Sequence, residues 1–251
     1  MANPVQHSIM KKILTLLLLL TTGLLFGQSF EGTLVYNLQY QFKISDKLAK
    51  MGMTEEKLIA RMKQDGSWSD SVKTMYKQGD YITYSNSNPQ SWSVYKSEIN
   101  KLYAFQEGEA SDICTVTDAS IDLEFQMTGQ KPSIVKLDTT AQINGMTCEV
   151  VQVKWKTGIY EYWYHPGTLP VDPKLFEKHI YDGWADYLKI SKALPIRIVK
   201  KVKGLATVTF TLAAQRAGKI DENLFKIPKL VSDKDLNAFK MANTEIMRIK
   251  K

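Results

Sequence analysis

The chain has 251 residues, of which 44% are hydrophobic and 24% are charged, and its formal net charge at pH 7 is +7. No linker or internal repeat divides the sequence after the N-terminal region, so we expect one domain. The lysines are scattered singly along the chain rather than gathered in a patch. This distribution favours a solvated surface and argues against a nucleic-acid partner.

The N-terminal region has the pattern of a secretory signal peptide. Two lysines precede an apolar run over residues 13–26, and the small residue Gly27 follows. The run is shorter than the roughly 18 to 20 residues that span a bilayer, so we expect cleavage near Gly27 or Gln28 rather than a membrane anchor. Residues 1–27 are therefore predicted to be an N-terminal extension and signal peptide. Residues 28–251 are predicted to be a single half-barrel domain, periplasmic or secreted, with no membrane span after cleavage.

Residues 29–42 alternate between apolar and polar side chains, which predicts a long strand with one buried face. A stretch with helical spacing follows, in which Thr54 suits an N-cap and Gly66 a helix end, so we expect two short helices or one kinked helix. The apolar face of the strand can cover a core alone or also a ligand. Candidate residues for lining a ligand cavity come from both elements: Leu34, Leu38, Tyr40 and Met62.

Strand patterns dominate from residue 72 onward. Hairpins are predicted over 72–86, 91–106 and 113–127, and further strands over 148–155, 159–165, 194–202 and 206–215. A short helical piece is expected over 173–179, and an amphipathic helix that carries Leu236, Phe239 and Ile246 is expected after Ser232. About nine to eleven consecutive antiparallel strands are expected to curl. The predicted fold is mainly β (α+β), a curved antiparallel sheet or unclosed β-barrel with a helical insertion and a C-terminal helix.

Two cysteines, Cys114 and Cys148, lie in strand-like segments. An even number in an oxidising compartment predicts one disulfide, and two buried free thiols are the alternative. Histidine is scarce, because only His165 and His179 follow the leader, and their spacing matches no known metal-binding motif. We therefore expect no metal and no cofactor.

Signals for catalysis are weak. The sequence has no GxSxG turn for a nucleophilic serine and no glycine-rich phosphate loop. Acidic pairs such as Asp182 and Asp186 lie in loop-like sequence, where solvated carboxylates are the common case. A hydrolase of the glycoside-cleaving kind stays open as the enzyme-class alternative.

Aromatic side chains are concentrated in one predicted hairpin, over residues 155–164, and they occupy both of its faces. One face can serve the core, and the other requires a second cover. Tyr160 and Trp163 are therefore candidates for a partner-binding surface, while a loop or small helix of the same chain is the alternative cover.

Several short motifs, in their order along the chain, resemble a known family. They are Phe30-Glu31-Gly32, Ile143-Asn144-Gly145 followed by Cys148-Glu149-Val150-Val151, Glu161-Tyr162-Trp163-Tyr164, Leu194-Pro195-Ile196 and Asn223-Leu224-Phe225-Lys226-Ile227-Pro228. With them the chain resembles the GLPGLI-type secreted proteins of Bacteroidota, a domain of unknown function. That family is similar in architecture to the LolA and LolB lipoprotein carriers, unclosed barrels with helices in their mouths. The resemblance implies a cell-envelope location and binding of lipid or lipoprotein acyl chains, and it supplies no catalytic residues.

These observations lead to one principal hypothesis and two alternatives. We expect an exported, non-enzymatic protein of the cell envelope that binds an apolar ligand, such as an acyl chain, in a half-barrel cavity. The first alternative is an envelope scaffold with a fully packed core, which would bind another envelope protein. The second is a hydrolase.

Overall fold

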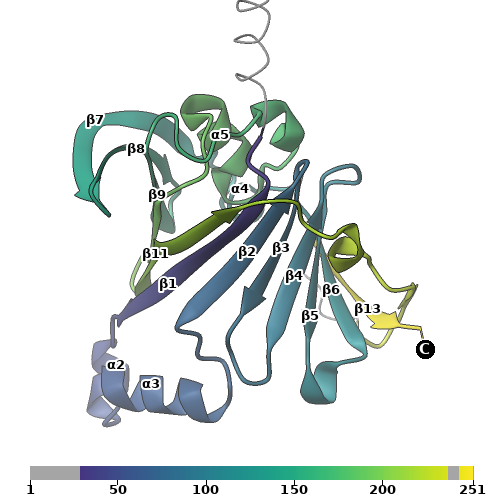
Figure 1. The fold of residues 1–251 in the computed structure, drawn as a ribbon. Helices are drawn as coiled ribbons and strands as arrows, with labels where there is room; N and C mark the ends of the chain where they lie inside the picture. Colours follow the sequence, from purple (N-terminus) through teal and green to yellow (C-terminus); the bar gives the residue numbers. More distant parts are fainter. Residues whose placement is uncertain (1–28, 237–242, 251) are drawn as a thin grey trace, which may run out of the picture.

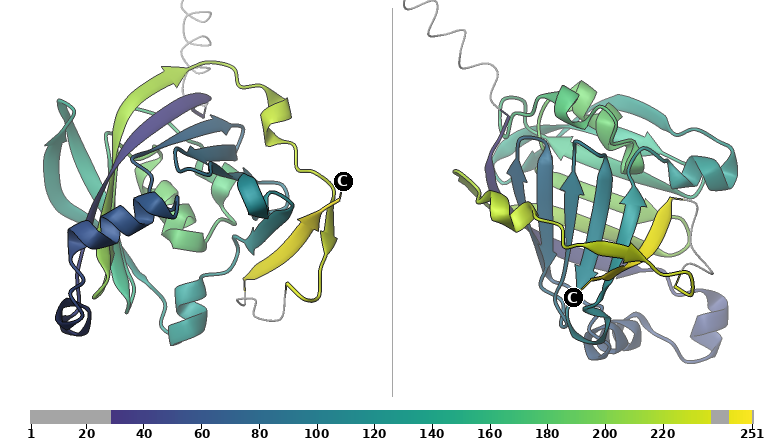
Figure 2. Two further views of the ribbon diagram at one scale, coloured as in Figure 1. Left: turned by 90° about the horizontal axis from the view of Figure 1, so that it is seen from below. Right: turned by 90° about the vertical axis from the view of Figure 1, so that its right-hand side faces the viewer.

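The computed structural model describes residues 29–236 and 243–250, which form one antiparallel sheet of 13 strands. In chain order the strands are β1 (Gly32–Phe42), β2 (Ser71–Lys77), β3 (Asp80–Ser85), β4 (Ser91–Lys96), β5 (Lys101–Gln106), β6 (Ile113–Asp118), β7 (Ser133–Ile143), β8 (Met146–Lys154), β9 (Gly158–Tyr164), β10 (Arg197–Val202), β11 (Ala206–Ala217), β12 (Leu230–Ser232) and β13 (Thr244–Ile249). Across the sheet the order is β12-β13-β6-β5-β4-β3-β2-β1-β11-β10-β9-β8-β7. The order begins and ends on different strands, so the sheet is open, and seen from below it curls around the central helical segments (Figure 2). The prediction of a mainly β fold with a curved, open sheet is confirmed.

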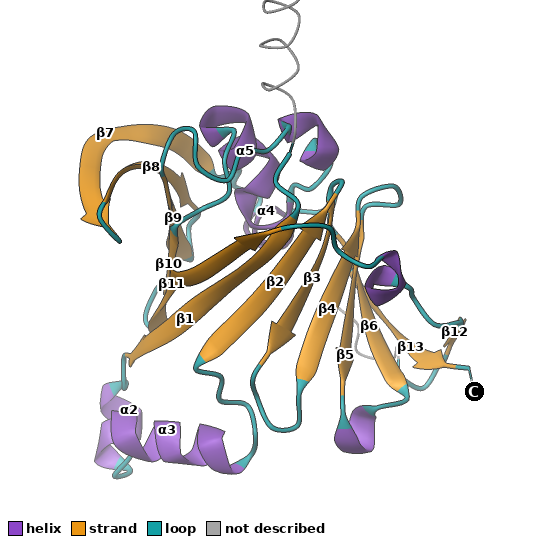
Figure 3. Ribbon diagram, viewed as in Figure 1, coloured by secondary structure: helices purple, strands orange, loops and turns teal. Residues whose placement is uncertain are grey.

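Helices are short in the described part of the chain (Figure 3). The α-helices are α2 (Asp46–Lys50), α3 (Glu55–Gln64), α4 (Leu123–Thr128) and α5 (Trp184–Ser191), and the 3-10 turns are η1 (Gly108–Ala110), η2 (Pro173–Phe176), η3 (Tyr181–Gly183) and η4 (Glu222–Phe225). Thr54 caps α3 as predicted, because its hydroxyl accepts a hydrogen bond from the Lys57 backbone N–H at 3.3 Å. Helices α2 and α3 lie beyond one end of β1 and β2, whereas α5 lies near the opposite end of the sheet (Figure 1). None of the helices in residues 29–236 and 243–250 is long and apolar enough to cross a membrane.

The C-terminal region differs from the prediction. Residues 244–249 form strand β13, so the predicted helix through Ile246 is wrong. Phe239 lies outside the described residues, as does the predicted signal peptide. The residues of β13 pair with the free edge of β6, with Met247 opposite Cys114, and this pairing with a distant strand overrides the local helical spacing. Because β12 and β13 join the edge, the sheet has more strands than expected.

The predicted hairpin over 113–127 is also wrong in its second half, because part of it forms helix α4. Asp122 caps that helix by accepting a hydrogen bond from the Phe125 backbone N–H at 3.0 Å, and Gly129 ends it in the left-handed conformation. The first strand, in contrast, is confirmed. It pairs with β2 on one side and β11 on the other, and a register shift on the β11 side falls between Val35 and Tyr36.

Two apolar clusters lie on opposite faces of the sheet. The concave cluster includes Leu34, Tyr162, Tyr187, Leu188 and Ile196, and it lies between the inside of the curl and residues 165–196. We call residues 165–196 the covering segment. Two hydrogen bonds connect the covering segment to the first strand and the residues before it. The Tyr36 hydroxyl donates to the Pro195 carbonyl at 2.7 Å, and the Phe30 N–H donates to the Pro170 carbonyl at 2.6 Å.

The convex cluster lies on the outside of strands β2 to β6. It is built around Ile82, Val94 and Val116 and is covered by residues 218–232, which we call the strap. The ring of Phe225, 4% exposed, is the part of the strap that is most deeply inserted.

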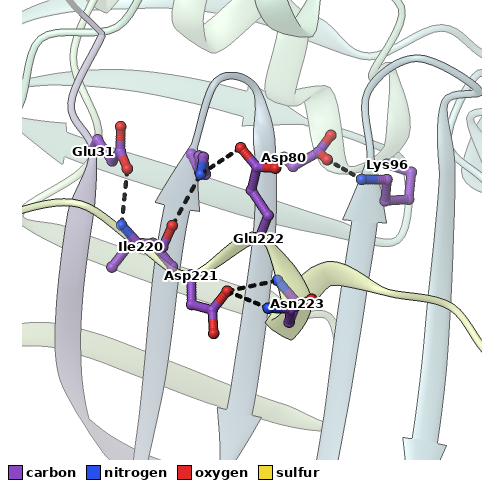
Figure 4. A network of polar contacts seen from close by, with 8 residues as sticks. Glu31, Asp80, Lys96, Ile220, Asp221, Glu222 and Asn223 are labelled. Atoms are coloured by element: carbon purple, nitrogen blue, oxygen red, sulfur yellow. Dashed lines mark hydrogen bonds and ion pairs between the residues drawn. The ribbon is translucent and has the colours of Figure 1, made fainter.

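Polar contacts hold the strap across the strands (Figure 4). The Glu31 carboxylate accepts from the Ile220 N–H at 2.8 Å, and Lys77 Nζ donates to the Ile220 carbonyl at 3.0 Å. Lys77 also pairs with Glu222 at 2.9 Å. The strap is therefore held at Ile220 through both the backbone N–H and the backbone carbonyl of that residue.

The two cysteines do not form the predicted disulfide. Both are free and fully buried, Cys114 in the convex cluster and Cys148 in the concave cluster. Burial among apolar side chains raises the pKa of the Cys114 thiol to about 12 and also raises the pKa of Cys148. They pack as small apolar residues, which was the alternative interpretation.

Candidate ligand-binding cavity

A cavity of about 260 Å³ lies between the concave face of the sheet and the covering segment. Its walls come from eight strands and from the covering segment: Tyr36, Val72, Thr74, Tyr76, Tyr81, Thr83, Ser93, Leu102, Tyr162, His179, Tyr181, Asp182, Trp184, Ile198, Lys200 and Phe210. Most of these side chains are aromatic or aliphatic, with a few polar groups among them. This composition is typical of a small-molecule site.

Small side chains on the sheet make the space. Thr74, Thr83 and Ser93 lie opposite one another in register on β2, β3 and β4. The hydroxyl oxygens of Thr74 and Thr83 are 3.0 Å apart and satisfy each other. One level further along the same strands, Tyr76, Tyr81 and Tyr95 form a row of rings with centroids 5.7 and 5.0 Å apart. The cavity thus opens where large rings give way to short hydroxyl side chains.

The roof of the cavity is the tight turn at η3. Asp182 and Gly183 both have left-handed backbones, with φ of 59° and 70°. A Cβ atom on Gly183 would lie 2.8 Å from Val153 Cγ1, so the turn requires glycine there. The Tyr162 hydroxyl donates to the Asp182 carbonyl at 2.7 Å and joins the turn to the sheet.

The charged groups of the cavity wall neutralise each other. Lys200 Nζ lies 2.5 Å from Asp182 Oδ2, and both side chains are about a quarter exposed, at 28% and 25%. The same ammonium lies 4.8 Å from the centre of the Tyr160 ring, within the range of a cation–π contact. The charges of Lys200 and Asp182 in the cavity wall are therefore paired with each other.

Two residues of the wall each have a fully buried nitrogen without a hydrogen-bond partner among the described residues: Nδ1 of His179 and Nε1 of Trp184. His179 is 3% exposed and Trp184 is 9% exposed. The other nitrogen of the imidazole, Nε2, lies 2.9 Å from the Tyr81 hydroxyl. Burial lowers the pKa of His179 to about 4, so the ring is neutral at physiological pH.

None of the four residues predicted to line the cavity is in its wall. Leu34 is fully buried in the concave cluster, and Leu38 is half-buried beside it on β1. Tyr40 is also half-buried, and its ring lies 4.6 Å from that of Trp68. Met62 lies in α3, on the part of the chain beyond the end of the sheet. The first strand does contribute to the cavity, but through Tyr36, which has the same parity in the alternating pattern.

The predicted partner-binding residues are half-buried. Tyr160 contacts Trp155 edge-on, with ring centroids 4.9 Å apart, and Trp163 packs against the concave cluster. The acidic residues Asp182 and Asp186 pair with different lysines, Lys200 and Lys189. In residues 29–236 and 243–250, no group of three or more histidine, cysteine or acidic side chains could hold a metal ion.

A second, wider hollow of about 690 Å³ lies beside the strap. Four of its charged side chains are paired with each other, Lys77 with Glu222 and Lys96 with Asp80 (Figure 4). The concave cavity is the better candidate for a ligand site, since its walls are mainly aromatic and aliphatic with a few polar groups among them.

Neither a protein-family model nor a curated protein sequence matches the chain. Similar solved structures include two of PNGF-II, in space groups C2 and P21, each 11% identical, with TM-scores of 0.39 and 0.40. The matches cover 77% and 78% of this chain but only 29% and 30% of those chains. Similarity at this level carries no argument about the function of this protein.

Proposed function

We propose that this protein is an exported, non-enzymatic carrier of the cell envelope that binds an apolar ligand, such as a lipid or an acyl chain, inside a LolA-like half-barrel. The observation that carries the proposal is the cavity of about 260 Å³ between the sheet and the covering segment, with its mainly aromatic and aliphatic walls. The export and the GLPGLI-type membership rest on the N-terminal pattern and on the sequence motifs.

A carrier accounts for the molecule better than a scaffold that binds a protein through the aromatic hairpin. Tyr160 and Trp163 are half-buried against other parts of the chain, so they do not form a projecting aromatic surface. The hydrolase alternative can be tested separately by screening the protein against acyl and glycosyl esters.

The test uses the full chain, expressed in a bacterium with its own N-terminal region and purified from the envelope. N-phenyl-1-naphthylamine, a neutral apolar dye that fluoresces in apolar surroundings, should bind saturably. Ser93→Phe places a ring in the cavity wall and should weaken dye binding at least about tenfold, equivalent to about 1.4 kcal/mol. Thr147→Phe, on an exposed position of β8, is the matched control and should bind like the wild type.

Two results would contradict the proposal. One is the absence of saturable dye uptake together with the absence of extractable lipid by mass spectrometry. The other is equal dye binding by Ser93→Phe and Thr147→Phe, which would place the dye elsewhere on the protein.

A further inference from the structure

A smaller hollow with aromatic walls lies next to the concave cavity. It measures about 190 Å³, and Tyr181 and Asp182 line both spaces. We call it the ring hollow. Its volume is below the roughly 300 to 1,000 Å³ of most small-molecule pockets, so its occupant must be a small molecule or one group of a larger one.

Three aromatic side chains line the ring hollow: Trp155, Tyr160 and Tyr181. The rings of Trp155 and Tyr160 meet at 64° with centroids 4.9 Å apart, so they stand at an angle to each other. Tyr160 already contacts one ammonium group, because Lys200 Nζ lies 4.8 Å from the centre of its ring. Lys200 belongs to the wall of the concave cavity and not to that of the ring hollow. Several aromatic rings around one site are the arrangement by which proteins bind quaternary ammonium groups.

The wall of the ring hollow is also negatively charged. It carries the carboxylates of Asp122, Glu124 and Asp182 and, among the described residues, no lysine or arginine. Of these three carboxylates, only Asp182 forms an ion pair within the described part of the chain, with Lys200 at 2.5 Å. The negative potential extends to the rings, since the charge of Asp182, together with burial, raises the pKa of Tyr181. The wall therefore favours a cation.

The carboxylate oxygens have little hydrogen-bonding capacity left for that cation. Asp122 Oδ1 accepts from the Phe125 N–H at 3.0 Å, and Asp122 Oδ2 accepts from Trp155 Nε1–H at 3.2 Å. Glu124 Oε2 is fully buried, and Asp182 Oδ2 is taken by its ion pair. A primary ammonium carries three N–H donors that require acceptors, whereas a quaternary ammonium carries none. The wall therefore suits a cation that needs rings and negative charge but no hydrogen bonds.

We infer that the ring hollow binds a quaternary ammonium group, such as the trimethylammonium of choline, among the rings of Trp155, Tyr160 and Tyr181. The cation is organic, because no group of histidine, cysteine or acidic side chains in residues 29–236 and 243–250 could hold a metal ion. This inference goes beyond the proposed function and does not depend on it.

The first experiment uses three probes of similar shape or charge and the full chain, purified as above, in calorimetric titrations at pH 7.5. The probes are choline, the primary amine ethanolamine, and 3,3-dimethylbutan-1-ol, which is the neutral carbon analogue of choline. Choline should bind saturably and at least about tenfold more tightly than either of the others. The N-methyl proton signal of choline should move upfield on binding, because protons above the face of an aromatic ring are shielded.

The second experiment changes the rings. Tyr160→Leu removes one wall of the ring hollow and should weaken choline binding at least about fivefold, whereas Tyr160→Phe keeps the ring and should bind like the wild type. Tyr84→Leu is the matched control, because Lys73 Nζ lies 5.1 Å from the centre of the Tyr84 ring and that ring is outside the hollow. The three-probe comparison needs no variant, so it tests the inference even where Tyr160→Leu does not fold.

The source of the ammonium group, a free small ion or the head group of a lipid, is distinguished with octyltrimethylammonium. Because Tyr181 and Asp182 line both spaces, the chain of a lipid-like ligand should extend into the concave cavity. Octyltrimethylammonium would then bind more tightly than choline and displace N-phenyl-1-naphthylamine. A site for a free ion would instead bind the two compounds alike and leave the dye in place.

The inference and the proposed function fail separately. Choline binding no tighter than that of 3,3-dimethylbutan-1-ol would overturn the inference, as would equal choline binding by Tyr160→Leu and Tyr84→Leu. Either result leaves the carrier intact if the dye still binds saturably. Absence of dye uptake with choline binding retained would contradict the carrier and support the ring hollow as a site of its own.

Discussion

The two faces of strands β2 to β6 differ at adjacent positions of the same strands. On the convex face Met75, Ile82, Val94, Tyr103 and Val116 lie in register and fill the space beneath the strap. On the concave face, one residue away in each strand, the corresponding row is Thr74, Thr83, Ser93, Ala104 and Thr115. Large side chains thus pack beneath the strap on one face, while small ones leave room beneath the covering segment on the other. A cavity in this protein comes from side-chain size along a register, not from a gap in the sheet.

The largest predicted effect concerns the closed face. Phe225→Ala removes the buried ring of the strap and should lower the free energy of unfolding by about 3–5 kcal/mol, because the cavity left behind cannot be filled by its neighbours. The measurement is urea denaturation. Binding of N-phenyl-1-naphthylamine below the transition should be unchanged, since the ring lies outside the concave cavity.

The control for this change is the adjacent residue. Leu224 is 38% exposed, so Leu224→Ala should have a much smaller effect. A similar loss for both variants would mean that the strap is not held by its buried ring, and a loss of dye binding in Phe225→Ala would mean that the two faces are not independent.

Much of the fold could be predicted from the sequence, because alternation is a local signal. The period of two predicts the hairpins over β2–β3 and β4–β5, and both are confirmed. The same signal could not say which face is concave. The apolar row of β2 to β6 faces outward, and its cover is the strap, more than a hundred residues away in sequence.

The site was harder to predict for the same reason. Leu34 and Leu38 have the right parity but lie beside the cavity, and only Tyr36 from that strand reaches it. The sequence offers His179 only as a weak candidate for a metal ligand, because its contact in the cavity wall, the Tyr81 hydroxyl, is 98 residues away along the chain. Trp184 carries no local signal, because its place in the cavity wall follows from the turn at η3, which precedes it. The sequence does not predict strand β13, because its partner strand, β6, is even more distant along the chain, with Met247 opposite Cys114.

The second prediction concerns the open face and its titration. The folded-state pKa of His179, about 4, lies below its ordinary value near 6.5, because burial disfavours the charged ring. Between pH 6.5 and pH 4 the unfolded chain takes up a proton on His179 that the folded chain does not. The contribution of the neutral imidazole to the free energy of unfolding is therefore complete above about pH 6.5 and is lost as the pH falls towards 4. The loss should be on the order of 3 kcal/mol. The groups near the imidazole include the Tyr81 hydroxyl, the Tyr95 ring at a centroid distance of 4.5 Å and the paired charges of Asp182 and Lys200.

The measurement compares the unfolding free energies of the wild type and His179→Phe at several pH values from 7.5 to 4. Other groups titrate in both proteins, so the difference between the two isolates the histidine. The stability of the wild type relative to the variant should decline across this range. A difference that stays constant with pH would show that the ring is not held neutral in the folded protein.

The smallest predicted effect distinguishes the faces through their cysteines. A disulfide between Cys114 and Cys148 would stabilise the fold by about 4 kcal/mol in the chain-entropy model, and reductant would then lower the urea midpoint. Because each thiol is buried in a different cluster, we expect no change in the midpoint on adding reductant.

Iodoacetamide should add no label to the native protein and two labels to the unfolded protein, since both thiols are fully buried and burial raises the pKa of both. Rapid labelling of Cys148 alone in the native protein would indicate that reagent enters the concave cluster, and an apolar ligand in the cavity should then slow the labelling. Labelling of Cys114 alone would instead mean that the strap opens more readily than the covering segment, which is the reverse of the comparison drawn from the two faces.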